Sequence, residues 1–369
     1  MSSTLGNVIK TTIFGESHGN AIGAVVDAFP AGYKIDLDQV NIQMKRRAPG
    51  SDQTATKRKE LDEPEILSGL LNGITTGAPL SLIIRNNDCH STDYSRFSDC
   101  PRPSHADYTA NVRYNGFNDI RGGGNFSGRL TAPLTAAGAI AKQILKANGV
   151  TIGGHVSFIG NTADTPFDPC LVDEKLLDSL NAQYFATVSS EAKASMNDEI
   201  AQAKADGDSI GGEVEIAVVG LPVGIGSPTV RGVENAVSSA VFAVPAVKGI
   251  EFGAGFGFAS MRGSEANDQM YYDGDTVKCK TNNSGGILGG ITNGMPLILR
   301  VALKPTPSIS LPQDTISLKL KQNDTISIKG RHDPCIVPRA LPAIESAVAL
   351  ALIDLIEEVR PLSKPNDQK

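Results

Sequence analysis

Apolar residues recur with two different spacings along the chain, and each spacing predicts a different kind of element. Runs rich in β-branched residues predict strands over 11–14 (TTIF), 21–27 (AIGAVVD) and 211–219 (GGEVEIAVV). Apolar positions three and four residues apart predict helices elsewhere. The predicted helices cover 36–47, with Asp36 as N-cap, and 229–244, 130–148, 338–359 and an exposed, amphipathic 191–206.

Part of this pattern occurs twice. Residues 69–80 (GLLNGITTGAPL) and 286–297 (GILGGITNGMPL) share eight of twelve positions without a gap. Upstream of each lies a similar turn, AFPAG at 28–32 and GLPVG at 220–224, which follows a predicted strand and precedes a predicted helix. We therefore expect two pseudo-symmetric β-α-β units, roughly 6–150 and 208–360, with the active site between them. The fold class is α+β or a layered β-α-β architecture.

The charge balance argues against nucleic acid as a partner. The chain carries 34 Lys and Arg against 40 Asp and Glu, a formal net charge of −6. Six basic residues nevertheless fall between Lys45 and Lys59. This cluster is either a solvated basic face or a local positive site for a small polyanion, and composition alone does not choose.

Cysteine usage and hydropathy indicate the compartment. The five cysteines are scattered and never in a CxxC spacing, which argues against a zinc site or a disulfide framework and fits a reducing compartment. No charged-then-apolar leader opens the chain, and no apolar run approaches the roughly 18 residues of a membrane helix. We expect a soluble, cytoplasmic protein without a membrane partner.

Two histidine segments are candidates for acid–base chemistry. GESHG (15–19) places Ser17 beside His18, but adjacent residues on an extended chain face opposite ways, so a Ser-His nucleophile pair is not expected. RPSHADY (102–108) puts His105 between Arg102 and Asp107, which suits a proton donor with a tunable pKa. For each histidine, a purely structural role is the alternative.

Three further segments combine charge with tight turns. RGGGNFSGR (121–129) offers converging backbone N–H groups, a following helix and flanking arginines, and is a candidate phosphate cradle although it matches neither Walker A nor GxGxxG. GRHDPC (330–335) brings a cation, an imidazole and a carboxylate together before the last helix. KPTPS (304–308) is a stiff loop whose polar groups could bind phosphate. A structural turn or a surface charge cluster remains open for each.

Taken together, the segments resemble the chorismate synthase family. GESHG, RPSHADY followed by RGGG, AVKGIEFG (246–253), GGILGGITNG (285–294), ALKPTPS and GRHDPC occur in that family's order and spacing, from about residue 6 to residue 355. The resemblance implies one domain over 1–369, a sandwich with helices packed between antiparallel sheets, and a homotetramer. It also implies an anti-1,4-elimination of phosphate from 5-enolpyruvylshikimate 3-phosphate to give chorismate, which requires reduced FMN without net redox change.

The resemblance assigns roles to the matching residues. His18 would assist phosphate departure, His105 would protonate or hydrogen-bond the reduced flavin, and Asp333 would help take the C6 proton. Ser17 and Ser127 would relay protons. Guanidinium groups suit the oxyanions of such a substrate, and Arg47, Arg102, Arg129 and Arg331 would bind its phosphate and carboxylates. Flavin contacts would come from Asn125, Phe126, Ser127, Pro245, Ala246, Gly289, Lys304, Pro305, Thr306, Pro307, Ser308 and Arg331.

Three positions depart from the family pattern. Asn125 stands where many members have arginine, Leu130 where they have glutamate, and Gln53 where a further basic residue is common. Lys57 or Arg58 could supply the anion contact that Gln53 lacks. Two other functions stay open, a flavin-binding relative without turnover and a generic phosphohydrolase. NADPH is a possible reductant, although no separable NADPH module is recognisable.

Overall fold

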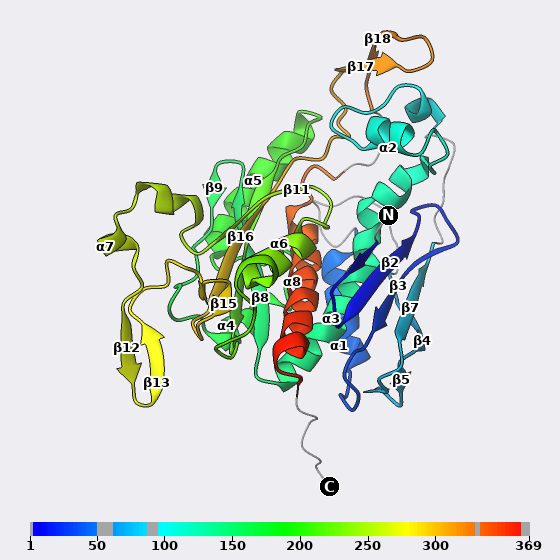
Figure 1. Ribbon diagram of the computed structural model, residues 1–369. Helices are drawn as coiled ribbons and strands as arrows, with labels where there is room; N and C mark the ends of the chain where they lie inside the picture. The colour runs from blue at the N-terminus through cyan, green and yellow to red at the C-terminus, as the bar shows by residue number, and fades with distance from the viewer. Residues whose placement is uncertain (1–2, 50–61, 87–94, 329–332, 363–369) are drawn as a thin grey trace.

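Two antiparallel sheets face each other across a layer of helices in the computed structural model, which describes residues 3–49, 62–86, 95–328 and 333–362 (Figure 1). In these residues the first sheet has the order β1-β2-β3-β7-β4 and the second β11-β16-β10-β8-β9. The first comprises β1 (Thr4–Leu5), β2 (Lys10–Gly15), β3 (Ala21–Asp27), β7 (Leu80–Arg85) and β4 (Glu65–Ser68). The second comprises β11 (Val247–Phe252), β16 (Leu297–Leu303), β10 (Gly212–Val219), β8 (Thr151–Ile159) and β9 (Thr162–Ala163). The predicted α+β sandwich is confirmed.

The helices between the sheets form the main core. They are α1 (Leu37–Arg47), α3 (Thr131–Ala147), α6 (Val233–Val241) and α8 (Val337–Val359), and α8 contacts the other three. Nearly all of α8 is buried, as its apolar run predicted. Gly138 lets α3 approach α8 closely, because a Cβ there would collide with the side chain of Ser346. The site-bearing loops therefore start from a rigid layer.

Helix boundaries match the sequence predictions except in the 229–244 segment. Asp36 caps α1 with its side chain on the Asp38 N–H, and α3 covers the predicted span to within a residue at each end. The 229–244 segment instead divides into η4 (Thr229–Arg231) and α6, which starts after Gly232 and ends at Val241. Gly232 has extended dihedrals, and Pro245 disfavours helical geometry in the residue before it.

The repeated segments adopt the same local structure. Residues 69–80 form β5 (Leu70–Leu71) and β6 (Ile74–Thr75) before β7, and 286–297 form β14 (Ile287–Leu288) and β15 (Ile291–Thr292) before β16. The Thr75 hydroxyl donates to Pro30 O at 2.7 Å and accepts from Tyr33 N. The Thr292 hydroxyl likewise donates to Pro222 O at 2.6 Å and accepts from Ile225 N. The two repeated segments therefore share both their strand pattern and their threonine contacts.

The remaining elements lie at the periphery. Helices α4 (Glu174–Leu180) and α5 (Ser190–Ala205) pack on β8 and β9. At the top of Figure 1 lies a small unit formed by η1 (Ser95–Ser98), α2 (Asp107–Arg113), β17 (Gln313–Ser317) and β18 (Gln322–Ile326). At the left, η5 (Gly255–Ser260), α7 (Gly263–Ala266), β12 (Met270–Asp273) and β13 (Thr276–Cys279) project from the second sheet. Across the described ranges, no helix is both long and apolar enough to cross a bilayer.

Candidate active site

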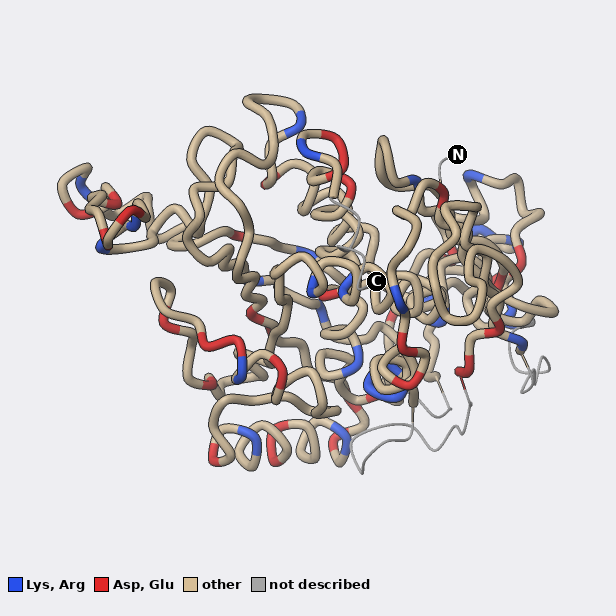
Figure 2. The backbone as a smooth tube through the Cα atoms, turned by 90° about the horizontal axis from the view of Figure 1, so that it is seen from below, with Lys and Arg blue, Asp and Glu red and all other residues tan. Residues whose placement is uncertain are grey.

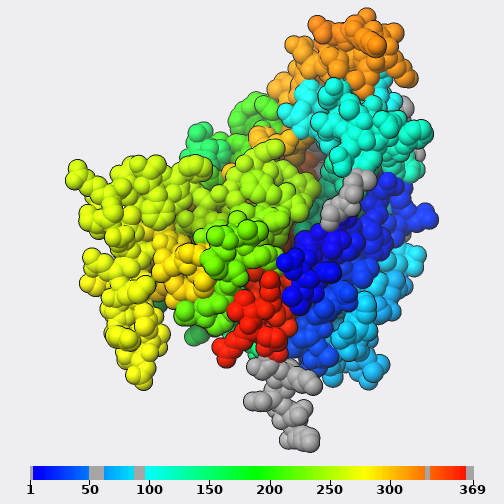
Figure 3. All heavy atoms as spheres, viewed as in Figure 1, coloured from blue at the N-terminus to red at the C-terminus, as the bar shows by residue number. Residues whose placement is uncertain are grey.

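A cavity of about 740 Å³ opens where segments distant in the sequence meet, and it is called the main cavity below. Figure 3 shows the surface hollowed where the cyan, green and orange parts of the chain come together. Its volume is that of a site for one or two small molecules. The predicted residues that line it are His105, Ser127, Asp333, Arg47, Arg102, Arg129, Asn125, Phe126, Pro245, Ala246, Lys304, Thr306, Pro307 and Ser308.

The triple-glycine loop forms one wall of the main cavity. Gly122, Gly123 and Gly124, within η2 (Arg121–Phe126), have φ of 59°, 85° and 54°, a region that glycine enters without steric cost. A Cβ on Gly122 would collide with the ring of His18 and lie 2.7 Å from Ser17 Oγ. Ser17 and His18 therefore lie directly behind Gly122, in the turn between β2 and β3. Neither is among the residues that line the main cavity.

His105 is oriented by a buried carboxylate. Asp107 Oδ1 lies 2.6 Å from His105 Nδ1 and 2.9 Å from Arg102 Nη2, and Asp107 Oδ2 accepts from Arg102 Nε at 2.8 Å. Burial alone would raise the pKa of Asp107, but the hydrogen bonds from Arg102 and His105 hold it well below its usual range. An ionised Asp107 fixes the proton on Nδ1, so Nε2 of His105, which faces Gly123, is the atom available to a ligand.

A second carboxylate connects two arginines of the main cavity. Asp62 pairs through one oxygen with Arg47 and through the other with Arg129, at 2.6 Å from its Nη1. Arg47 also donates to Thr131 Oγ1 and Gly128 O, each at 3.1 Å. Arg129 donates from Nε to Asn86 Oδ1 at 2.7 Å. Both guanidinium groups are thus held in one orientation.

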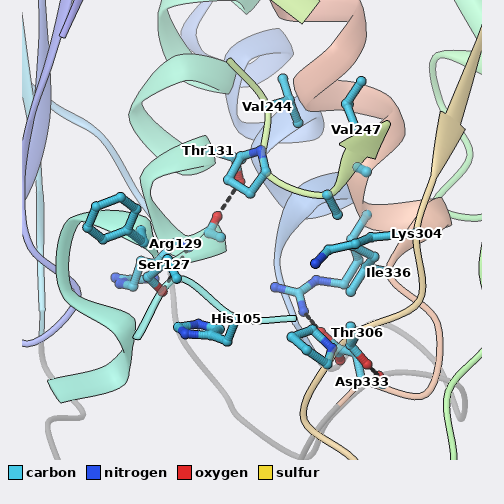
Figure 4. A pocket seen from close by; sticks show the side chains of 18 of the residues that line it. His105, Ser127, Arg129, Thr131, Val244, Val247, Lys304, Thr306, Asp333 and Ile336 are labelled. Carbon is cyan, nitrogen blue, oxygen red and sulfur yellow. Dashed lines mark hydrogen bonds and ion pairs between the residues drawn. The ribbon is translucent and has the colours of Figure 1, made fainter. Parts of the chain in front are cut away.

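The opposite wall comes from the KPTPS loop and the start of α8. Figure 4 shows His105 between Ser127 and Arg129 on one side and Lys304, Thr306 and Asp333 on the other. Asp333 pairs with Arg339, whose Nε donates to Arg47 O at 3.1 Å. Lys304 donates to Ser104 O at 2.5 Å, and burial lowers its pKa, as does the nearby Lys248.

The loop before β11 is strained where it lines the main cavity. Ala246 has φ of 73°, which is rare for a residue with a Cβ. Such strain persists where the surrounding structure over-determines it, commonly at a binding site. This observation supports the predicted contact of Ala246 with a ligand.

Five predicted residues are not among the described residues that line the main cavity. Two of them have been placed behind Gly122, and the other three are Gly289, Pro305 and Arg331. Gly289 lies in the turn between β14 and β15 and is not among the residues that line the main cavity. Pro305 lies against Gly211 and is not among the residues that line the main cavity, although Lys304 and Thr306 on either side of it are. Arg331 falls outside the described residues, as do Gln53, Lys57 and Arg58. The predicted flavin contacts of Gly289 and Pro305 therefore stay predictions, without support from the lining of the main cavity.

The two other departures from the family pattern border a second, smaller cavity. Asn125 lines both cavities, and Leu130 lines the second one, of about 240 Å³, beside Leu5, Ile13 and Leu134. Leu130 thus supplies an apolar surface where many family members carry a carboxylate. The polar side of Asn125 remains available to a ligand in the main cavity.

Sequence reasoning missed three charged residues. Lys248 belongs to the AVKGIEFG segment and lines the main cavity, but no role was assigned to it. Arg339 lies on the first turn of α8, six residues after Asp333, and its closeness to the GRHDPC motif was the available signal. Asp62 lies in an unremarkable acidic stretch, LDEPE, and no local signal marks it. No cluster of three or more His, Cys, Asp or Glu that could hold a metal occurs among the residues described.

The main cavity is positive although the protein is acidic. Lys and Arg positions are interspersed with Asp and Glu positions over the described chain (Figure 2). Among the described lining residues, one carboxylate, Asp333, faces a larger set of cations. These are Arg47, Arg102, Arg129, Lys248, Lys304 and Arg339. Of the two interpretations of the basic cluster, a local positive site for a small polyanion therefore applies at least to Arg47. The electrostatic field of the lining cations favours a polyanionic ligand.

Comparisons with known proteins agree with this geometry. The family model described as chorismate synthase matches residues 9–356. Curated proteins named chorismate synthase from Dehalococcoides mccartyi and Thermococcus kodakarensis are 45% and 44% identical, over 96% and 95% of this chain and 96% of each relative. A solved structure entitled "Crystal Structure of Chorismate Synthase" superposes with a TM-score of 0.76 at 28% identity, over 96% of this chain and 93% of the other.

Proposed function

The chain belongs to the chorismate synthase family and is a lyase, and we propose that it converts 5-enolpyruvylshikimate 3-phosphate to chorismate and phosphate with reduced FMN as cofactor. In this anti-1,4-elimination the C3–O bond to phosphate breaks and a proton leaves C6. The observation that carries the proposal is the main cavity itself. It combines an oriented histidine, a carboxylate on the opposite wall and six lining cations among the described residues.

The cations fit a substrate with two carboxylates and a phosphate. Arg47, Arg102 and Arg129 are buried and held by carboxylates, so little side-chain freedom is lost when they bind an oxyanion. Arg339 and Lys304 add positive charge on the opposite side. We assign Arg331 to the same group on the resemblance alone.

The residues also fit FMN. Gly122 of the triple-glycine loop lines the main cavity, and so does the strained Ala246. The KPTPS loop contributes Lys304, Thr306, Pro307 and Ser308 to the lining. Asn125, Phe126, Ser127, Pro245, Ala246, Lys304, Thr306, Pro307 and Ser308 would hold the flavin, and Gly289 and Pro305 have no such support. When bound, reduced FMN supplies electron density to a reaction with no net redox change.

The chain's own residues then hold and move protons. His105 presents Nε2 to the main cavity with Nδ1 fixed on Asp107, so it can hydrogen-bond or protonate an acceptor there. Asp333, on the opposite wall, is assigned to help take the C6 proton. His18 is assigned as the acid for phosphate departure, with Ser17 and Ser127 as relays. Arginines around the leaving phosphate stabilise its developing charge.

The cellular setting is also proposed from the family. We propose a cytoplasmic homotetramer that acts on a small-molecule substrate. NADPH is the candidate reductant of the flavin. Light scattering would measure the assembly, and anaerobic NADPH oxidation with FMN present would test the reductant.

The decisive experiment is anaerobic turnover of 5-enolpyruvylshikimate 3-phosphate with dithionite-reduced FMN, followed by the absorbance of chorismate. Wild type should form chorismate only with reduced FMN, and His105→Ala should be slower by about a hundredfold or more, as for loss of an acid–base group. Folded, FMN-binding wild type that forms no chorismate would indicate a flavin-binding relative without turnover. Phosphate release without reduced flavin would indicate a phosphohydrolase.

A further inference from the structure

Asp62 occupies an unusual place relative to the main cavity. Its side chain is 1% exposed and bridges Arg47 and Arg129, one carboxylate oxygen to each. Both arginines line the main cavity, whereas Asp62 is not among its lining residues. The carboxylate therefore lies behind the two guanidinium groups, on the side away from a ligand.

The positive charges at this wall need such a counter-charge. Arg47 lies near Arg129 and Arg339, and both like charges disfavour its protonated form. Burial, together with the like charges of Arg339 and Arg129, lowers the pKa of Arg47 to about 10, while Asp62 opposes this shift. Without Asp62, the buried guanidinium groups of Arg47 and Arg129 would repel each other with no carboxylate between them.

The same arrangement recurs on the neighbouring wall. Arg102 lines the main cavity and is held from behind by Asp107, which is also not among the lining residues. Each of these three arginines thus has part of its donor set fixed on a carboxylate behind it, while its side chain lines the main cavity. Asp107 has an additional partner in His105, whereas Asp62 bonds, within the part of the chain that the structure describes, to Arg47 and Arg129.

We propose that Asp62 is a positioning residue for substrate recognition, which sets the separation and orientation of Arg47 and Arg129 so that together they bind one anionic group of the substrate. It acts through the arginines and does not touch the substrate. A carboxylate that competed with the substrate for Arg47 and Arg129 would lie on the cavity side of their guanidinium groups. Asp62 lies on the opposite side. This inference rests on the proposed function.

The test compares Asp62→Asn with Glu345→Gln. Glu345 is a matched control, because it is also a buried carboxylate that bridges two cations, Arg46 and Lys142 at 2.8 and 2.7 Å, but in the helix layer outside the main cavity. Steady-state KM and kcat for 5-enolpyruvylshikimate 3-phosphate, competitive inhibition by inorganic phosphate, and urea unfolding are measured for both.

Asp62→Asn should raise KM and the inhibition constant of phosphate by about tenfold or more with a much smaller change in kcat, since binding common to ground and transition states is lost. Glu345→Gln should lose stability without raising KM. If Asp62→Asn does not fold, Asp62→Glu, which keeps the charge but displaces it, should still raise KM. Unchanged KM in every folded Asp62 variant of an active enzyme overturns the inference. Absence of turnover by wild type overturns the proposed function instead.

Discussion

At the scale of single residues, Gly122 links the two histidine motifs. Its positive φ turns the glycine loop toward the main cavity, and its missing side chain leaves the space that the His18 ring occupies. Gly122 thus lies between the main cavity and the pair Ser17 and His18, and only a residue without a Cβ leaves room for them there. The GESHG and RGGG segments can therefore pack against each other only if residue 122 is glycine.

Gly122→Ala should therefore impair catalysis more than it impairs folding. The added Cβ must displace His18, and a misplacement of about 1 Å at a catalytic group costs on the order of a hundredfold in rate. The measurement is kcat/KM for chorismate formation. Gly149→Ala is the control, since Gly149 has φ of 80° with open space around it, and it should lose stability while keeping kcat. Equal effects of the two variants would contradict the role of His18.

Residue chemistry explains what could be predicted of the site. His105, Arg102, Arg129 and Lys304 belong to motifs whose local composition already combines charge with turns, and the structure brings them to one cavity. Asp62 could not be predicted, because its importance comes from contacts with residues 15 and 67 positions away. A motif does not show which of its residues face a ligand, so the flavin contact of Pro305, which lies against Gly211, stays a prediction.

At the scale of elements, the duplicated hairpins are held by two equivalent threonines. Thr75 and Thr292 are buried, and each bridges a carbonyl and an N–H of the turn before the helix. Thr75→Val and Thr292→Val should each destabilise the protein by about 1–3 kcal/mol, because each leaves buried backbone groups unsatisfied. Urea unfolding measures this.

Thr11→Val is the control for the threonine pair. Thr11 is fully buried in β2, and its hydroxyl has no hydrogen-bond partner among the described residues. Replacing that hydroxyl with a methyl group should be neutral or stabilising. If one of the paired threonines behaves like Thr11, the two hairpins are not equivalent in energy.

The stability of the contact between β8 and β10 should depend on pH, because the buried His155 of β8 contacts Glu215 of β10. His155 Nδ1 lies 2.7 Å from Asp164 and Nε2 lies 2.9 Å from Glu215. Burial alone would lower the pKa of His155, but the hydrogen bonds to Asp164 and Glu215 raise it. A raised folded pKa stabilises the fold fully below the ordinary value of 6.5, and this stabilisation is lost as pH rises through the folded pKa.

The stability advantage of wild type over His155→Gln should thus shrink with rising pH. Free energies of unfolding measured in urea between about pH 6 and pH 9 test this, because glutamine does not titrate there. An advantage that stays constant or grows across this range would show that His155 is not protonated in the folded state. Asp164, whose pKa is lowered, stays ionised throughout the range.

At the scale of the whole molecule, helix spacing and the internal repeat were sufficient to predict a layered α+β fold, but not the partition of its strands. Which strands join which sheet depends on pairing between segments that are distant in the sequence. The strands β3 and β7, for example, pair although α1 lies between them along the chain. The predicted helix over 229–244 was too long, because periodicity does not register that Gly232 lies against Gly290 of the β14–β15 hairpin. Local pattern specifies elements, and tertiary contacts decide where they end.

The contrast between an acidic protein and a positive main cavity has a measurable consequence. A net charge of −6 repels an anionic substrate at long range, whereas the lining cations attract it at short range. Salt screens both fields, but the attraction by the lining cations has the larger effect on KM, because the bound substrate lies next to them. KM for 5-enolpyruvylshikimate 3-phosphate should therefore rise several-fold as ionic strength increases from about 0.01 M to 0.1 M, while the screening length falls from about 30 Å to about 10 Å. The kcat should change little.

Lys248→Gln should weaken this salt dependence, because Lys248 is an exposed cation that lines the main cavity. Lys278→Gln is the matched control, since Lys278 lies on the projecting β12–β13 hairpin and pairs with Asp273 (Figure 1). Both variants change the net charge equally, so a whole-molecule field predicts the same salt slope for the two. A smaller slope for Lys248→Gln alone would locate the attraction in the main cavity, and equal slopes would assign it to the overall charge.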